Sequence, residues 1–367
     1  MSRYIISGGG TGGHIFPAIS IANALREIEP ECGILFIGAE GRMEMERVPA
    51  AGYEIVGLKV EGFDRKRLLR NVRVLRELWQ SIGKAKKIMR EFKPDVVVGV
   101  GGYASGAALK AAAALGIPIL LQEQNGFAGV TNKLMAKQAE KICVAYEGMD
   151  KFFPKDKVIL TGNPVRQNLT EGAAHRAEAY ELFGLREDRP VLLIIGGSLG
   201  ARTINESVIE ALPRLKDSGV QVIWQTGRAY IEAARRSYEP YRCAEIVVTD
   251  FVSRMDLAYA IADLVISRAG ASSISELCLL GKAAILVPSP NVAEDHQTHN
   301  AMALSTRGAA ILVKDAEARE RLIDTALETI GDKEKTMELS RNALTLAQRD
   351  SARRIAEEVI KLKGRRK

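Results

Sequence analysis

The chain is poor in cysteine and in aromatic residues, and each shortage excludes a class of protein. Its 367 residues include four scattered cysteines without a CxxC pair: Cys32, Cys143, Cys243 and Cys278. This spacing indicates neither a disulfide framework nor a zinc site, and it is typical of a reducing cytosol. Aromatic residues are only 5% of the chain, which disfavours a nucleic-acid surface built on stacked rings.

Long apolar segments are missing as well. No uninterrupted apolar run reaches the ~18–20 residues that a membrane-spanning helix needs, and we expect no signal peptide before the strand-like residues 4–6. We therefore expect any membrane contact to be peripheral. The formal net charge of +7 favours an anionic partner, which composition leaves open among nucleic acid, nucleotide and acidic lipid.

Short apolar runs alternate with helix-length amphipathic segments in both halves of the chain. This rhythm predicts an α/β protein with two doubly wound parallel sheets, whose carboxyl edges face each other across a cleft. Gly162, Asn163 and Pro164 break regular structure, so the first domain is predicted over 1–163 and the second over 164–341. A last, charged helix is expected at roughly 334–362. The predicted strands are 3–7, 33–37, 54–58, 95–100, 117–121 and 141–145, then 191–195, 220–225, 245–248, 263–267 and 284–287.

A glycine-rich loop follows the first predicted strand. Gly8, Gly10 and Gly13 formally spell GxGxxG, a pattern that lets backbone amides approach an anion at a helix N-terminus. One interpretation is a nicotinamide dinucleotide site with Glu40 as the ribose-binding acid. A broad site for the acceptor substrate of a transfer reaction fits better, because His14 directly follows the glycines and a second glycine loop lies at 99–103.

The second half carries its own candidate anion site. Residues 196–198 offer amides and a hydroxyl after a strand, and at 266–276 a strand, a glycine turn and a helix follow one another. Ser272 or Ser273 is expected to cap that helix, whose N-terminus suits a pyrophosphate. Glu276 either accepts both hydroxyls of a ribose or complements the helix dipole. The i,i+3 pair His296 and His299 is too weak a pattern to predict a metal site.

Basic residues concentrate between 64 and 93 and are interleaved with apolar ones at nearly helical spacing. Such a segment suits an anionic membrane surface, where each basic residue contributes ~1 kcal/mol. The alternative is that its apolar face packs in the core while the charges are solvated. The residues predicted to contact lipid are Arg65, Lys66, Arg67, Leu68, Leu69 and Trp79.

Several short motifs, in this order and spacing, resemble one known family over nearly the whole chain. They are residues 9–14, 101–103, 123–125 with 129–133, 161–166, 196–198 with 200–202, Ser275-Glu276, and Gln297 with Asn300-Ala301. Together they resemble the bacterial N-acetylglucosaminyltransferases that convert lipid I to lipid II in peptidoglycan synthesis, the MurG family.

The resemblance implies a GT-B fold whose final helix, about 342–367, packs back on the first domain. It implies an inverting hexosyltransferase that moves N-acetylglucosamine from UDP-N-acetylglucosamine to the C4 hydroxyl of the muramic acid of lipid I. It further implies a peripheral protein at the cytoplasmic face of the cell membrane, acting in cell-wall synthesis, with cell-wall synthesis or division proteins as candidate partners. No obligatory cofactor, metal or nucleic acid is expected.

Carried over residue by residue, the resemblance assigns a donor site and an acceptor side. The donor residues are Thr11, Gly12, Gly13, Asn125, Arg166, Ser198, Val252, Ala271, Ser272, Ser273, Ile274, Ser275, Glu276 and Gln297. The acceptor side comprises Thr11, His14, Gly102 and Tyr103. The chain departs from some relatives at Leu199, where they have Gln, and at Gln122, where they have His.

Two residues are candidates for the base that takes the proton of the acceptor hydroxyl. His14 is the first, because histidine titrates near neutral pH, and Glu123 is the alternative. Rival functions are a diacylglycerol glycosyltransferase, a UDP-N-acetylglucosamine epimerase and a non-catalytic UDP-sugar-binding subunit.

Overall fold

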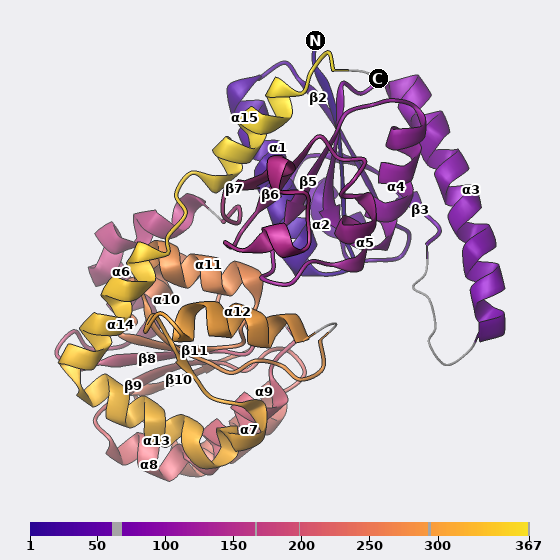
Figure 1. The fold of residues 1–367 in the computed structure, drawn as a ribbon. Helices are drawn as coiled ribbons and strands as arrows, with labels where there is room; N and C mark the ends of the chain where they lie inside the picture. Colours follow the sequence, from indigo (N-terminus) through magenta and orange to yellow (C-terminus); the bar gives the residue numbers. More distant parts are fainter. Residues whose placement is uncertain (61–67, 166, 198, 293–294, 366–367) are drawn as a thin grey trace. The chain divides into compact units, whose positions relative to one another are not determined.

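Two α/β units make up the protein in the computed structural model, which describes residues 1–60, 68–165, 167–197, 199–292 and 295–365 (Figure 1). The first unit comprises Met1–Val165 and Arg349–Lys367, and the second comprises Arg166–Gln348. The boundary predicted from the sequence lies between residues 163 and 164. Each unit contains one parallel sheet, so the prediction of two doubly wound parallel-sheet domains is confirmed.

The sheet of the first unit has seven parallel strands in the order β3-β2-β1-β4-β5-β6-β7. The direction of strand addition reverses between β1 and β4, which makes this pair the switch point where such sheets bind ligands. The strands are β1 (Arg3–Gly8), β2 (Gly33–Ala39), β3 (Glu54–Leu58), β4 (Val96–Gly101), β5 (Ile119–Glu123), β6 (Lys141–Val144) and β7 (Val158–Leu160).

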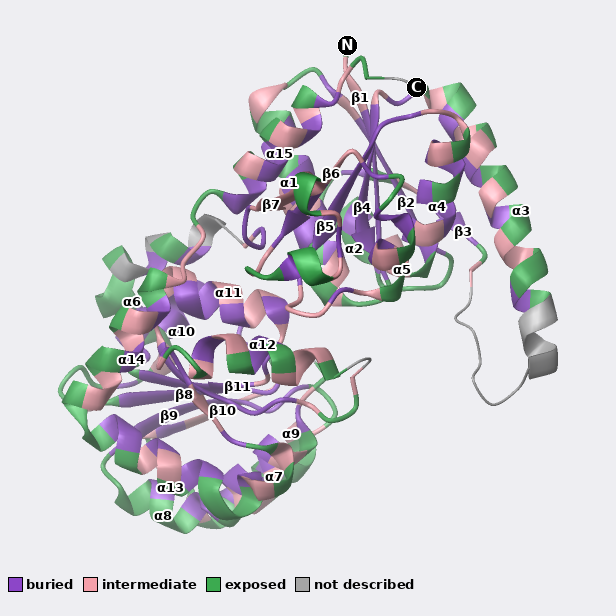
Figure 2. Cartoon of the chain, viewed as in Figure 1, coloured by how far each residue is buried: buried purple, intermediate pink, exposed green. Residues whose placement is uncertain are grey.

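Helices cover both faces of this sheet, and alternate residues of each strand enter the two cores. Tyr4 and Ile6 pack with α1 (Gly12–Ile28) and α15 (Ser351–Lys361), whereas Ile5 packs with α3 (Leu68–Phe92) and α4 (Tyr103–Ala114). The central strands β1, β2, β4 and β5 are almost wholly buried, whereas the edge strands β3 and β7 are partly exposed (Figure 2). Two shorter helices, α2 (Glu44–Ala50) and α5 (Val130–Met135), follow β2 and β5.

The second unit repeats the plan with six parallel strands in the order β10-β9-β8-β11-β12-β13, and its switch point lies between β8 and β11. The strands are β8 (Val191–Ile195), β9 (Gln221–Gln225), β10 (Ile246–Thr249), β11 (Leu264–Ser267), β12 (Ala283–Leu286) and β13 (Ile311–Leu312). The helices are α6 (Arg176–Phe183), α7 (Arg202–Glu210), α8 (Leu212–Asp217), α9 (Ile231–Tyr238), α10 (Met255–Ile261), α11 (Ala271–Leu280), α12 (His296–Ser305), α13 (Ala318–Gly331) and α14 (Lys333–Thr345). Short 3-10 turns lie at Met149–Lys151, Lys155–Lys157, Gln167–His175, Glu239–Tyr241 and Asp315–Glu317.

Three expectations about the elements were wrong. The edge strands β7 and β13 were missed because they have only three and two residues, too few for a period to show. The strand expected at 117–121 is β5 at 119–123, and this shift brings Gln122 and Glu123 into the sheet. The helix expected at 334–362 is two helices, α14 and α15, separated where Asp350 adopts the left-handed φ of 55°.

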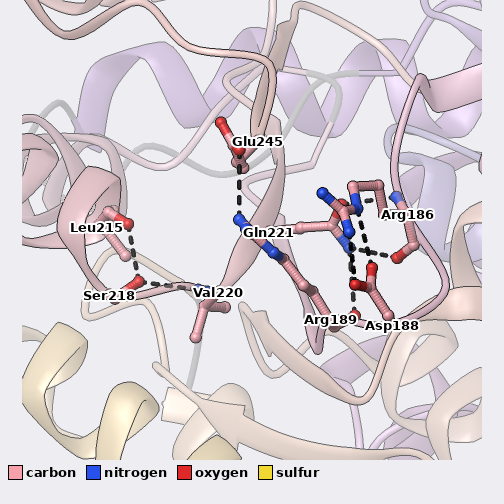
Figure 3. Close-up of polar contacts among 8 residues, drawn as sticks. All are labelled: Arg186, Asp188, Arg189, Leu215, Ser218, Val220, Gln221 and Glu245. Carbon is pink, nitrogen blue, oxygen red and sulfur yellow. Dashed lines mark hydrogen bonds and ion pairs between the residues drawn. The ribbon is translucent and has the colours of Figure 1, made fainter.

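Polar side chains close the amino edge of the second sheet, opposite the edge that carries the glycine loops. The buried Gln221 accepts a hydrogen bond from the Arg186 amide and donates to the carbonyl oxygens of Arg186 and Arg189 (Figure 3). Arg189 also pairs with Glu245, which directly precedes β10. These bonds tie the loop before β8 to β9 and stabilise the fold at this edge.

Lys282 lies at the same amino edge, directly before β12. Its Nζ donates to the carbonyl oxygen of Ala262 at 2.9 Å. Burial lowers the pKa of this ammonium from 10.5 to about 8; Asp263 opposes the lowering and Arg176 adds to it. The folded protein therefore releases this proton at a lower pH than the unfolded chain does.

Because the unfolded chain binds the proton more tightly, Lys282 contributes more to the free energy of unfolding as the pH rises from about 8 to about 10. We expect the difference between wild type and Lys282→Met, in urea unfolding, to grow in favour of wild type by about 1–2 kcal/mol between pH 8 and 9.5. Burial raises the pKa of the Cys143 and Cys278 thiols to about 12, so these groups make the protein less stable as the pH rises. Because wild type and variant share both thiols, their contribution cancels in the difference between the two proteins. Lys110→Met, at an exposed position of α4, is the control and should show no such trend. A difference independent of pH for Lys282→Met would contradict the prediction.

Candidate functional site

Two glycine loops meet at the switch point of the first unit. The loop after β1 and the loop after β4 lie so close that a Cβ at Gly102, whose φ is 91°, would come within 2.6 Å of the Gly9 carbonyl oxygen. A Cβ at Gly101 would lie 2.8 Å from Nε2 of His14. Only glycine allows this approach. The structure therefore brings together His14 and Gly102, which the sequence assigned to one acceptor side.

His14 stands in the first turn of α1 and is partly exposed. Its Nδ1 lies 3.0 Å from the carbonyl oxygen of Gly9 and 3.5 Å from Oγ1 of Thr11. Thr11 is the N-cap of α1, and its side chain makes no capping hydrogen bond. Tyr103 begins α4 and is 61% exposed. The predicted acceptor residues thus sit where the two glycine loops meet, with the side chains of Thr11, His14 and Tyr103 at or near the surface.

Sequence reasoning missed Glu44, the first residue of α2. Its side chain is completely buried and its two oxygens accept hydrogen bonds from the amides of Gly10, at 2.9 Å, and Ala39, at 3.0 Å. A side chain at Gly9 would overlap the carboxylate, and a Cβ at Gly38 would lie 2.6 Å from its Cγ. The only sequence signal was its i,i+4 spacing to the buried Val48. Glu40, the acid of the dinucleotide interpretation, is exposed and pairs with Lys84.

Glu123, the last residue of β5, is a second buried carboxylate and is only 2% exposed. Burial raises its pKa, whereas hydrogen bonds from the Gly129 amide, Asn132 and Asn125 lower it. The Gly129 amide and Asn132 Nδ2 donate to Oε2 at 3.0 and 2.9 Å, and the amide of Asn125 donates to Oε1 at 3.2 Å. The carboxylate therefore folds the loop between β5 and α5 around itself.

Gln122, at the position where some relatives have histidine, lies inside the sheet and is fully buried. Its Nε2 donates to Oδ1 of Asn163 at 3.0 Å, and Asn163 Nδ2 donates to the carbonyl oxygen of Gln124 at 2.9 Å. Gln124 in turn donates to the Val100 carbonyl oxygen at 2.7 Å. This buried network fixes the carboxyl ends of β4 and β5, and Gln122 plays a structural part in it.

A third glycine loop follows β8 in the second unit. A Cβ at Gly196 would lie 2.7 Å from the Ala201 amide, so the turn into α7 is tight. Ser198 lies outside the described residues, and its neighbour Leu199 is 72% exposed. Sequence reasoning missed Gln225, which is buried and donates to the Gly197 carbonyl oxygen at 3.2 Å.

Gln225 also holds the loop that follows β10. The amide of Val252 donates to Gln225 Oε1 at 3.1 Å, so this N–H is already engaged inside the protein. The backbone N–H of Val252, a predicted donor residue, is thus used to position the loop. Gln225 connects the glycine loop after β8 with the loop that carries Val252.

The helix α11 begins at Ala271, after a short turn that follows the end of β11 at Ser267. Its N-cap is Gly270, with no side-chain capping bond, so the expectation that Ser272 or Ser273 caps this helix was wrong. Both serines lie in the first turn, and Ser275 Oγ donates to the Ala271 carbonyl oxygen at 2.9 Å. Ile274 is buried in the same turn. The first amides of a helix have no carbonyl partner within the helix itself, and such an N-terminus suits an anion.

Glu276 lies one turn further along α11 and is mostly buried. The Tyr259 hydroxyl donates to its Oε2 at 3.2 Å, which orients the carboxylate. Gln297, on α12, accepts a hydrogen bond from the Ser289 amide at 2.9 Å, so it holds the loop after β12. Asn300 of the same helix donates to the Ala269 carbonyl oxygen at 3.3 Å, beside the start of α11.

Arg268 was also missed, although it stands directly after β11. Its Nη1 donates to the carbonyl oxygens of Val287 and Pro288 at 3.1 and 3.2 Å, and it pairs with Asp315. Asp315 accepts from the Thr203 hydroxyl of α7 at 2.9 Å. This cluster joins three loops at the carboxyl edge of the second sheet.

Several predicted residues lie outside the part of the chain whose side chains the structure describes. Arg166 and Ser198 lie outside the described residues, as do Arg65, Lys66 and Arg67, and the side chains of Leu68 and Leu69 are not described. Trp79 is on α3 and is 73% exposed. Within the described ranges, no group of three or more His, Cys, Asp or Glu residues could hold a metal ion.

At each carboxyl edge, then, glycine turns and helix N-termini present backbone amides, and buried polar side chains hold the loops in place. Such edges bind anions, most readily phosphate groups. The second unit adds the buried carboxylate of Glu276 near the start of α11, which suits ribose hydroxyls. The first unit adds an imidazole, which suits proton transfer.

Comparison with known proteins identifies related chains along both units. A model described as the glycosyltransferase family 28 N-terminal domain matches residues 4–144, and one described as the C-terminal domain of that family matches residues 191–359. A protein of Parabacteroides distasonis is 60% identical over 360 residues, which are 98% of each chain. A protein of Phocaeicola vulgatus is 61% identical over 361 residues, which are 98% of this chain and 96% of the relative.

Both relatives carry the name UDP-N-acetylglucosamine–N-acetylmuramyl-(pentapeptide) pyrophosphoryl-undecaprenol N-acetylglucosamine transferase. Among solved structures, the crystal structure of Acinetobacter baumannii MurG is 28% identical, with a TM-score of 0.79. That match covers 98% of this chain and 100% of the other.

Proposed function

The chain belongs to the family of UDP-N-acetylglucosamine–N-acetylmuramyl-(pentapeptide) pyrophosphoryl-undecaprenol N-acetylglucosamine transferases, the MurG family, and from this premise we propose how its residues carry out the reaction. The enzyme transfers N-acetylglucosamine from UDP-N-acetylglucosamine to lipid I, which gives lipid II for peptidoglycan synthesis. Its two parallel-sheet units correspond to the GT-B fold. The family, fold class and activity expected from the sequence are thereby confirmed.

The donor binds the second unit at the carboxyl edge of its sheet in this proposal. The observation that carries it is the start of α11, where Gly270 caps the helix without a side-chain bond and Glu276 follows one turn later. The diphosphate would accept hydrogen bonds from the first amides of α11 and from the glycine loop after β8, with Ser198 beside it. Glu276, oriented by Tyr259, would accept the ribose hydroxyls.

Uracil would lie against the loop that Gln225 holds, with the Val252 carbonyl as its partner, since the Val252 amide is already bonded. Gln297 belongs to the proposed donor site of the second unit, and Asn125 and Arg166 stay donor contacts predicted from the family resemblance. Leu199 would offer the sugar an apolar contact where some relatives offer an amide, while the backbone amides of the loop remain.

Transfer with inversion is a single displacement. The C4 hydroxyl oxygen of the muramic acid attacks the anomeric carbon, the bond from that carbon to the diphosphate breaks, and the bonding electrons leave with UDP. The hydroxyl proton passes to Nε2 of His14. Amides of α11 and of the glycine loop stabilise the charge that develops on the departing diphosphate.

Glu123 is the weaker candidate for the base. Its raised pKa suits a base, but it is almost fully buried and its oxygens accept from Asn125, Gly129 and Asn132. Those contacts favour a structural part, holding the loop that presents Asn125. His14 is partly exposed beside Thr11 and Gly102 on the acceptor side, which favours it for proton transfer.

We further propose that α3 carries the first unit to an anionic membrane surface at the cytoplasmic face. Trp79 and Leu75 are 73% and 45% exposed on this helix, beside Arg73 and Arg76. In the described part of the chain no helix has the length and apolar character needed to cross a bilayer. The predicted contacts at 65–69 precede Leu75 and Trp79 along the chain and add further basic and apolar residues to this segment of the sequence.

The proposed function is tested by transfer assays with purified protein. We expect transfer from UDP-N-acetylglucosamine to a soluble lipid I analogue and no transfer to diacylglycerol. Transfer only to diacylglycerol, or donor binding with no transfer to either acceptor, would overturn the assignment of the acceptor.

The role of His14 is tested in the same assay. For His14→Ala we expect kcat to fall by about 10²–10⁴-fold, because the proton acceptor is lost. The KM for UDP-N-acetylglucosamine should stay near that of wild type, because His14 is not among the proposed donor residues. His299→Ala, an exposed histidine of α12, is the control and should keep kcat. Near-normal turnover of His14→Ala would remove this residue from the chemistry.

The membrane surface is tested by flotation with vesicles that contain an anionic phospholipid. Leu75→Ser with Trp79→Ser should weaken binding by about tenfold or more, because each apolar side chain contributes on the order of 1 kcal/mol or more when buried. Charge reversal at Arg65, Lys66 and Arg67 should weaken it further and reduce its dependence on salt. Met337→Ser, an exposed apolar position of the second unit, is the matched control. Unchanged flotation of both sets of variants would refute α3 as the contact.

A further inference from the structure

A single peptide group joins Glu44 to His14. The peptide between Gly9 and Gly10 donates its N–H to Oε2 of Glu44 at 2.9 Å. Its carbonyl oxygen, on the Gly9 side, lies 3.0 Å from Nδ1 of His14. Carboxylate, amide and imidazole therefore form one continuous chain of hydrogen bonds.

Glu44 is held rigidly at the buried end of this chain. Its second oxygen accepts from the Ala39 amide at 3.0 Å, at the end of β2, and the residue has no exposed surface. Gly9 and Gly38 make room for it, since a side chain at Gly9 would overlap the carboxylate and a Cβ at Gly38 would lie 2.6 Å from Cγ. A buried carboxylate is costly unless N–H donors satisfy it, and here two backbone amides do so.

The carbonyl end of the chain determines which nitrogen of His14 carries the proton. A carbonyl oxygen only accepts hydrogen bonds, so Nδ1 must be the donor in this contact. In the neutral imidazole Nε2 then bears the lone pair. That is the tautomer that can take a proton at Nε2.

We propose that Glu44 is a positioning residue for catalysis, acting on His14 through the Gly9–Gly10 peptide. The inference rests on the proposed role of His14 as the base. The buried carboxylate polarises the peptide, so its carbonyl becomes a better acceptor for the Nδ1 proton, and successive hydrogen bonds in such chains reinforce one another. Glu44 thus fixes the ring orientation and tautomer of His14 and stabilises the imidazolium that forms during transfer.

The kinetic test replaces Glu44 by Gln, whose amide group turns an N–H₂ toward one of the two backbone N–H donors. We expect kcat to fall about tenfold to a hundredfold with a nearly unchanged KM for UDP-N-acetylglucosamine. Glu44→Asp, which keeps the charge, should recover part of kcat. Glu46→Gln, an exposed position on the same helix, is the matched control and should match wild type.

A double-mutant cycle separates action through His14 from general damage to the fold. If Glu44 acts through His14, Glu44→Gln should cost nothing further in kcat once His14 is Ala. Equal losses in the two backgrounds, or a kcat of Glu44→Gln within about twofold of wild type, would overturn the proposal.

A second readout needs no turnover. The chain has four histidines, so ¹⁵N-histidine labelling gives four ring-nitrogen patterns in NMR, and His14→Gln identifies that of His14. We expect His14 as the Nδ1–H tautomer in wild type and in Glu46→Gln, and a mixture of tautomers in Glu44→Gln. An unchanged pattern in folded Glu44→Gln would refute the link. If His14→Ala retained turnover while Glu44→Gln still altered the tautomer, the role of His14 as base would fail and the coupling of the two residues would stand.

Discussion

Close approach of one backbone segment to another, at places where glycine removes the side chain, is the constraint on which both binding edges depend. Gly102 lies against the Gly9 carbonyl, Gly101 against the His14 ring, and Gly196 against the Ala201 amide. A methyl group at any of these positions would push the loops apart. The amides at the carboxyl edges reach an anion because nothing larger than hydrogen stands between the turns.

Loops rich in glycine are flexible, and here buried polar side chains hold them in place. Glu44 and Glu123 each accept backbone amides from a neighbouring loop, and Gln225 joins the glycine loop of the second unit to the loop that carries Val252. Bonds from amides to a carboxylate are stronger than neutral ones, and in the interior they have no competition from water. Burying two carboxylates costs free energy, and the hydrogen bonds that these carboxylates accept hold His14 and Asn125 in fixed positions.

The two edges of the second sheet have different roles. At the amino edge of the second sheet, Gln221 and Lys282 bond to carbonyl and amide groups of neighbouring loops, and these contacts stabilise the fold. At the carboxyl edge the glycine turns and the start of α11 present amides. Parallel strands impose this division, because the carboxyl ends of all strands, and the helices that follow them, begin at the same edge.

The sequence by itself determined the two parallel sheets, since eleven of their thirteen described strands lie at predicted apolar segments, and the family, because its motifs occur in a specific order. It also marked His14, which directly follows a glycine loop, and Glu276, which lies about one turn inside a predicted helix, while the resemblance to the family pointed to Glu123. Only the tertiary structure revealed Glu44 and Gln225 and showed that Gly270, not a serine, caps α11. Their partners lie on other strands or loops, and local periodicity carries no information on which distant backbone amide a buried side chain will meet.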